Sequence, residues 1–219
     1  RHRVGAAGLA VTGGRFDRRY RPHRLDRYLR VRFMRGVSSD EPRVDINELL
    51  DEFYDQPIGH SQLGEFEPTD SVPTPYDRLL DHHEHMTVTV ESHYGQKVAV
   101  QVHRYHTKGD WYAREITLVT SESQRIVQYG IVRIDTTKLE PMVWSEIENQ
   151  STPLGRVLVK HDVLREVQLC GLWRVKAGPS LAAMMHLTVG EVLYGRTALI
   201  FCHGSPAIEL LEIVAPVAT

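Results

Sequence analysis

From residue 86 onward, apolar side chains alternate with polar ones along several short runs of the sequence. A period of two places successive side chains on opposite faces of a strand, and turn residues separate the runs. Strands joined by short turns pair antiparallel, so this pattern constrains the fold to a sheet built largely from hairpins. The runs predicted as strands are 86–90, 98–102, 111–120, 125–134, 194–202 and 207–214.

The first two runs predict a hairpin. The run that begins at Met86 alternates with threonines, the run that ends at Val102 alternates with polar residues, and Gly95 lies between them. Glycine tolerates the positive φ that a tight turn requires. We therefore expect residues 86–102 to form two paired strands.

Helical patterns stand before and between the strands. Asp45 precedes a run with apolar residues at helical spacing, and Thr152 precedes Pro153, which is favoured at a first helical position. Further helical sequence is predicted at 76–83 and 141–148, a loop at 56–75, and either helix or strand within 163–189. Together these segments predict an α+β fold: a single domain with a mostly antiparallel sheet of about six strands, flanked by helices that cover an internal ligand pocket.

The formal net charge of −2 hides two unlike parts. Residues 1–43 carry 12 Arg, no Lys and four acids, a balance of +8, whereas residues 44–219 carry a balance of −10. A basic arm that binds nucleic acid is one interpretation. No helix-turn-helix pattern supports it, and an acidic domain repels phosphates. We therefore interpret residues 1–43 as a poorly ordered extension and 44–219 as the folded domain.

Composition also limits the class of protein. Cys170 and Cys202 are too few for a disulfide framework and are typical of a reducing, cytoplasmic protein. No apolar run of about 18 residues predicts a membrane span. Six histidines between 82 and 106 lack the spacing of known metal signatures, so no metal site is predicted.

One predicted strand carries an arginine in an otherwise apolar row. In the run 111–120, alternation puts Arg114 on the same face as Tyr112, Ile116 and Leu118. Burying a guanidinium without a partner costs several kcal/mol. Arg114 must therefore either pair with an acid or hold an anionic ligand.

The last predicted strand repeats this pattern with an acid, because Glu212 shares a face with Leu210 and Val214. Two interpretations stay open. In one, Arg114 and Glu212 form a buried structural ion pair. In the other, they line a cavity in which Arg114 binds a carboxylate through its fork of donors and Glu212, its pKa raised by burial, transfers a proton. The helix start at 152–156 is either an ordinary cap or a further anion site.

Six short stretches, in this order, resemble the chorismate lyase (chorismate–pyruvate lyase, 4-hydroxybenzoate synthase) family. They are HMT (85–87), WYAREI (111–116), TPLGR (152–156), YGR (194–196), GSP (204–206) and EIVAP (212–216). The resemblance implies an enzyme, a carbon–oxygen lyase that eliminates pyruvate from chorismate and leaves 4-hydroxybenzoate or an isomer, in ubiquinone or other aromatic biosynthesis. It implies no cofactor and no metal.

The resemblance also assigns roles to individual residues. Arg114 would bind the ring carboxylate, the backbone N–H of Leu154 would contact the same group, Glu212 would be the catalytic acid, and Met86 would form a pocket wall. A second cation is expected for the other carboxylate. Arg104, Lys97 and Arg156 are the candidates for this cation, and Arg104 is counted among the predicted substrate-binding residues.

Two further classes of protein are kept as alternatives. One is a non-catalytic domain that binds a small aromatic carboxylate, related to the effector domains of GntR-type regulators. The other is a structural protein in which Arg114 and Glu212 merely pair. For the lyase, the expected partners are small molecules, namely chorismate and its aromatic product, and not nucleic acid or membrane. The family resemblance does not cover about 20 extra residues between Arg165 and Val192, which could reshape a lid over the pocket, and the sequence gives no oligomeric state.

Overall fold

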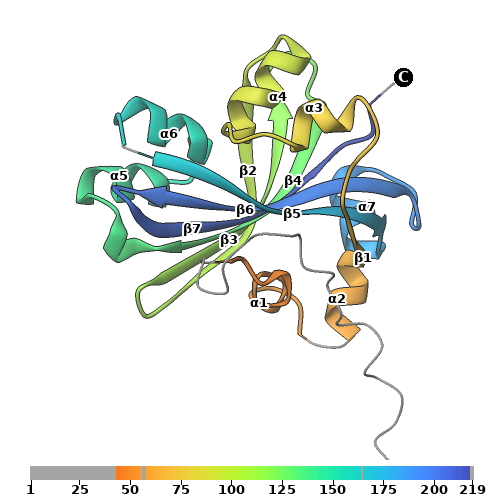
Figure 1. Ribbon diagram of the computed structural model, residues 1–219, viewed down its shortest axis with the longest axis horizontal. Helices are drawn as coiled ribbons and strands as arrows, with labels where there is room; N and C mark the ends of the chain where they lie inside the picture. The colour runs from red at the N-terminus through yellow and green to blue at the C-terminus, as the bar shows by residue number, and fades with distance from the viewer. Residues whose placement is uncertain (1–42, 56–57, 164, 218–219) are drawn as a thin grey trace, which may run out of the picture. The chain divides into compact units, whose positions relative to one another are not determined.

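The computed structural model describes residues 43–55, 58–163 and 165–217, which form one domain around a single sheet (Figure 1). In this part of the chain the sheet has seven strands in the order β1-β5-β6-β7-β4-β3-β2, and each neighbouring pair is antiparallel. The strands are β1 Gly64–Thr69, β2 Val98–Lys108, β3 Trp111–Thr120, β4 Ile126–Asp135, β5 Arg165–Ala177, β6 Val192–Cys202 and β7 Ser205–Val214. The predicted α+β class and antiparallel sheet are confirmed, and the basic segment 1–42 lies outside the described residues.

Helices cover both faces of the sheet (Figure 1). On one face, α1 (Ile46–Asp51), α2 (Ile58–Leu63) and α7 (Pro179–Met185) contribute to one apolar cluster with the odd-numbered residues of β4 and β7. The other face carries α3 (Tyr76–Leu80), α4 (Met86–Tyr94), α5 (Pro141–Glu148) and α6 (Leu154–Lys160), which pack on two further clusters, and a short 3-10 helix, Thr136–Lys138, leads into α5. The core is therefore divided by the sheet into two layers.

The hairpin predicted for residues 86–102 is wrong, because its first half is the helix α4. Met86, Thr87 and Val90 are buried whereas Val88 is 47% exposed, a pattern that fits one face of a helix. Gly95 adopts φ 64° as the left-handed cap of α4 rather than as a hairpin turn. The partner of β2 is instead β3.

Two further segments differ from their predictions. Residues 56–75, expected as a loop, contain α2 and β1, and β1 pairs with β5 at the edge of the sheet. The ambiguous block 163–189 contains a 13-residue strand, β5, followed by α7. The segment between Arg165 and Val192 is therefore not mainly a lid: β5 lies in the sheet, and α7 packs on the face that carries α1 and α2. These segments add two strands, β1 and β5, to the five predicted runs that are strands in the structure, and the described sheet therefore has seven.

Of the two predicted helix starts, the cap at Asp45 is confirmed and the cap at Thr152 is wrong. Asp45 caps α1, since its Oδ1 accepts from the backbone N–H of Asn47 at 2.8 Å. At α6 the cap position is Pro153, without a side-chain cap bond, so Thr152 does not cap this helix and Pro153 is not its first residue.

Candidate ligand pocket

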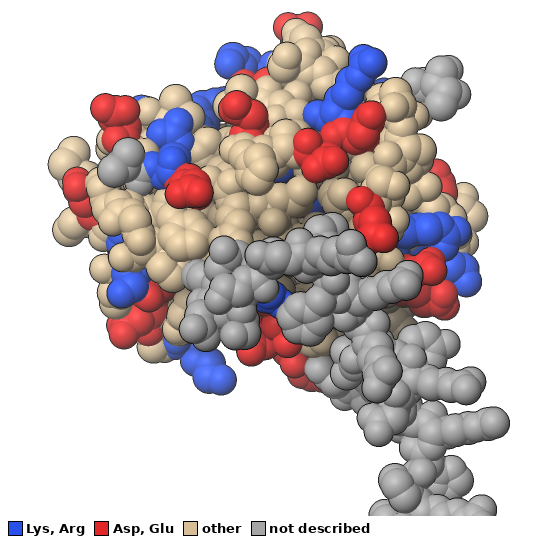
Figure 2. Space-filling model, viewed as in Figure 1, with Lys and Arg blue, Asp and Glu red and all other residues tan. Residues whose placement is uncertain are grey.

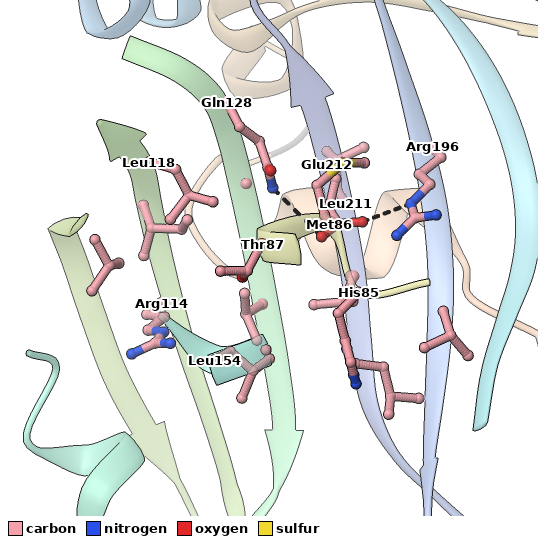
Figure 3. Close-up of a pocket in the computed structure, with 18 residues that line it drawn as sticks. His85, Met86, Thr87, Arg114, Leu118, Gln128, Leu154, Arg196, Leu211 and Glu212 are labelled. Carbon is pink, nitrogen blue, oxygen red and sulfur yellow. Dashed lines mark hydrogen bonds and ion pairs between the residues drawn. The ribbon is translucent and has the colours of Figure 1, made fainter. Parts of the chain in front are cut away.

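A buried cavity of about 40 Å³ lies between the centre of the sheet and the helix starts of α4 and α6 (Figure 3). This exceeds the roughly 10–15 Å³ that one water requires. Its walls are mostly apolar and come from β2 to β7, while Met86, Thr87, Leu154 and Gly155 close it from the helix side. An ideal Cβ on Gly155 would lie only 3.0 Å from Thr87 Oγ1, so glycine permits the close approach of α6 to α4. The polar groups in its lining are Arg114, Gln128, Arg196, Glu212, His85 and Thr87.

Arg114 is the strongest chemical feature of this cavity. Arg114 is 1% exposed, and its Nε has no hydrogen-bond partner. Its Nη1 donates only a long hydrogen bond of 3.4 Å to the Ile147 carbonyl. Burial lowers the pKa of Arg114, and the neighbouring Tyr112 side chain offsets part of that shift. A guanidinium in this state lacks the anionic partner that normally compensates burial of a charge.

Glu212 does not pair with Arg114 but with Arg196, directly opposite it on β6. Arg196 is 0% exposed, and its Nε donates to Glu212 Oε2 at 2.7 Å. Of the two interpretations, the one in which Arg114 and Glu212 form an ion pair is wrong, because Glu212 pairs with Arg196 instead. Glu212 lines the cavity, but its carboxylate already accepts a hydrogen bond from Arg196.

Arg196 also holds the chain segment between α3 and α4. Its Nη1 donates to the His82 carbonyl at 2.9 Å and its Nη2 to the Glu84 carbonyl at 3.1 Å, with a longer bond to the Leu80 carbonyl. One buried side chain thus fixes Glu212 and the backbone that leads into α4. From the sequence, Arg196 is named only as part of the YGR stretch and is not a predicted site residue. It shares an apolar row with Ala198 and Ile200, so the argument applied to Arg114 also predicts that Arg196 is buried and paired.

His85, the cap residue of α4, is held as a neutral imidazole. Burial, together with the nearby charges of Arg165 and Arg196, lowers the pKa of His85 to about 4. The contact geometry agrees, because Arg165 Nε donates to His85 Nε2 at 2.5 Å and arginine cannot accept. The Nε2 atom must therefore be unprotonated.

This arrangement predicts acid sensitivity. Between pH about 6.5 and 4 the unfolded chain binds a proton that the folded His85 does not, so the free energy of unfolding should fall as the pH drops through this window, by about 2–3 kcal/mol in total. Urea denaturation at pH 7 and 4.5 measures the change. His85→Gln should remove this part of the pH dependence, whereas His93→Gln, at an exposed position of α4, should retain it. An equal pH dependence in His85→Gln and the wild type would contradict the assignment.

The remaining residues predicted for the site are divided between the cavity and the rest of the domain. Met86 and Leu154 line the cavity, as do Arg114 and Glu212. Arg104 does not reach it. A bulge between Val102 and Arg104 inserts one residue, which turns Arg104 to the opposite face of the sheet, where its Nε donates to Glu115 Oε2 at 2.7 Å.

Glu115 anchors the opposite face. Its Oε1 accepts from the hydroxyls of Tyr54 at 2.5 Å and Tyr129 at 2.6 Å, in addition to the bond from Arg104. Burial alone would raise the pKa of Glu115, but these hydrogen bonds outweigh it and the pKa is lowered. This network is structural, because it joins the segment after α1 to the sheet, and it explains why Arg104 is not available for a ligand.

The other cations considered for a second carboxylate are also engaged. Lys97 Nζ pairs with Glu91 at 2.9 Å, and Arg156 pairs with Glu91 and donates to the Val98 carbonyl. Among the described residues, no group of three or more His, Cys, Asp or Glu side chains is arranged to hold a metal ion. None of the described helices has the length and apolar composition to cross a bilayer.

The fold and the cavity define a class of protein: an α+β domain in which an antiparallel sheet and overlying helices enclose a small cavity with a buried, unpaired arginine. Searches for relatives by sequence give no further assignment, since no protein-family model and no curated protein matches this chain.

Solved structures with a similar fold are regulator domains. The effector domain of PhnF from Mycobacterium smegmatis has 10% identity and a TM-score of 0.46, over 60% of this chain and 87% of that domain. PhnF itself has 8% identity and the same score, over 59% of this chain, which spans 63% of PhnF. The ligand-binding domain of a GntR-family regulator from Bordetella bronchiseptica has 11% identity and a TM-score of 0.40, over 54% and 85% of the two chains.

The prediction of a chorismate lyase is wrong. The similar structures are effector and ligand-binding domains of regulators and not lyases, and no family model supports the resemblance. The predictions that depend on it are also wrong: the elimination of pyruvate from chorismate, the 4-hydroxybenzoate product and the enzyme class. The geometry gives a physical reason: Glu212, the expected acid, already accepts a charge-assisted hydrogen bond from Arg196.

Proposed function

We propose that this domain is a non-catalytic ligand-binding module that holds a small organic monocarboxylate, with the carboxylate on Arg114. The observation that carries the proposal is the buried guanidinium whose Nε has no partner. A carboxylate matches the planar fork of donors on arginine and supplies the missing counter-charge. The first residues of α4, Met86 and Thr87, also line the cavity, where the start of a helix adds N–H donors that favour an anion.

The charges in the lining favour one negative charge on the ligand. Arg196 and Glu212 compensate each other, and His85 is neutral, so Arg114 is the uncompensated charge among the lining residues. A dianion would require a second cation, and Arg104, Lys97 and Arg156 are all paired elsewhere. The apolar walls favour a hydrocarbon body, so we expect an aromatic or alicyclic monocarboxylate.

A regulatory role completes the proposal. The similar solved structures are named as effector or ligand-binding domains of regulators. We propose the same kind of role for this domain on the strength of its cavity. A cytoplasmic location is the matching expectation. On the face in Figure 2, acidic and basic side chains are interspersed and not gathered in a basic patch, which agrees with a small-molecule partner rather than nucleic acid for this face.

A panel of carboxylates tests the proposal. Thermal unfolding and titration calorimetry of the full chain should be measured with acetate, benzoate, cyclohexanecarboxylate and 2-naphthoate, with benzamide as the neutral isostere and phthalate as a dianion. A ring-sized monocarboxylate at 100 times its Kd should add about 2.7 kcal/mol of stability, a rise in melting temperature of about 5–10 °C. Benzamide should give no shift. Equal effects of benzamide and benzoate, or no effect of any carboxylate at millimolar concentration, would refute the proposal.

A further inference from the structure

Gln128 on β4 presents a buried acceptor with no partner. The residue is 3% exposed and lines the cavity, and its side-chain carbonyl oxygen, Oε1, has no hydrogen bond. Its amide nitrogen, Nε2, donates to Glu212 Oε1 at 3.5 Å. A buried carbonyl that lacks a donor costs free energy, so a donor delivered by a ligand would be favoured at this point.

The orientation of this amide is fixed by its neighbours. Arg196 holds the Glu212 carboxylate as an acceptor, so the side chain of Gln128 must turn its NH₂ group toward Glu212. The reversed amide would place two acceptors against each other. The ion pair of Arg196 and Glu212 therefore positions Gln128 and leaves Oε1 free to accept.

Gln128 lies at the other end of the cavity from Arg114 (Figure 3). Arg114 pairs with Val132 on β4, which is two inward-facing positions along the strand from Gln128. Four residues of strand separate these rungs, roughly 13 Å between Cα atoms. Gly130 lies between them and lines the cavity, and an ideal Cβ on it would lie 3.1 Å from the Leu211 carbonyl oxygen and 3.7 Å from the Ile116 side chain, so a larger residue would crowd the space between the two polar ends.

We infer that Gln128 is a specificity-determining residue that selects ligands with an O–H or N–H donor opposite their carboxylate. This inference rests on the proposed function, because it assumes that Arg114 binds the carboxylate. It narrows the ligand class to hydroxy- or amino-substituted monocarboxylates with a six-membered ring or a skeleton of similar length.

The test compares isosteric ligand pairs that differ in one donor. Titration calorimetry of the full chain with 3- and 4-aminobenzoate, each against the corresponding methylbenzoate, gives the preference for the donor as a ratio of Kd values. The wild type should prefer at least one amino compound by about tenfold or more. Gln128→Met, which keeps the length of the side chain, should reduce that ratio to about one or reverse it. Gln101→Met, the same change at an exposed position of β2, should leave the ratio as in the wild type.

The outcomes separate this inference from the proposed function. If both members of each pair bind the wild type equally, or if Gln128→Met keeps the wild-type ratio, Gln128 does not determine specificity although Arg114 can still bind the carboxylate. If none of the four compounds binds although benzoate does, the inference fails alone, and if no carboxylate of either set binds, the proposed function fails and the inference fails with it. Should Gln128→Met not fold, as judged by circular dichroism, Gln128→Asn, which keeps the amide but withdraws it from the cavity, must lower the ratio for the inference to stand.

Discussion

Replacing Arg196 with methionine is expected to lower the free energy of unfolding by about 3–5 kcal/mol, since removing one member of a buried ion pair leaves the other charge uncompensated. Arg196 is fully buried, and its loss would leave the Glu212 carboxylate with only the long bond from Gln128. The carbonyls of His82 and Glu84 would lose their donors as well. Urea denaturation followed by circular dichroism measures the change.

A surface ion pair on the neighbouring strand provides the control. Arg174 on β5 pairs with Glu67 at 3.3 Å, and the two side chains are 46% and 69% exposed. Arg174→Met should therefore cost no more than about 1 kcal/mol. The double variant Arg196→Met with Glu212→Leu should recover much of the lost stability, because it removes the unpaired charge. A loss below about 1 kcal/mol in Arg196→Met would show that Arg196 does not hold the pocket together.

Alternation in the sequence predicted much of the sheet because strands β3, β4, β6 and β7 keep their regular pairing with one another over most of their length, with register shifts only near one end of the β3–β4 and β6–β7 ladders. The same alternation failed at α4. Its β-branched residues favour a strand locally, and packing of Met86, Thr87 and Val90 against the cavity and sheet overrides that preference. A cap glycine and a turn glycine look alike in sequence, so Gly95 could not decide between a helix end and a hairpin.

The site was predictable to the extent that charge in an apolar row is visible in a sequence. Arg114 and Glu212 were found in this way, and Arg196 obeys the same rule. The partners were not predictable, because pairing depends on the register that places Arg196 opposite Glu212. Arg104 shows a further limit: one inserted residue in β2 moved it to the other face, and such a bulge leaves no mark in the alternation before it.

Replacing Arg114 with methionine should separate binding from stability. Without ligand, the variant should be at least as stable as the wild type, with a gain of about 1 kcal/mol, because it removes a buried charge whose Nε lacks a partner. Its affinity for the carboxylate that binds best should fall at least about 30-fold, since truncating one member of a buried charge pair costs about 2–5 kcal/mol or more of binding. Urea denaturation and titration calorimetry measure the two effects.

The opposite signs of these effects distinguish a ligand-binding arginine from a structural one. A structural Arg114 would lose several kcal/mol of stability on truncation and leave carboxylate affinity unchanged, and that result would contradict the proposed role. Arg114→Lys keeps the charge but not the planar fork, so it should bind more weakly than the wild type and more tightly than Arg114→Met. Arg78→Met, at an exposed position of α3, should change neither quantity by more than a small amount. Binding that depends on the fork, together with stability that does not fall when Arg114 is truncated, would assign this guanidinium to a ligand.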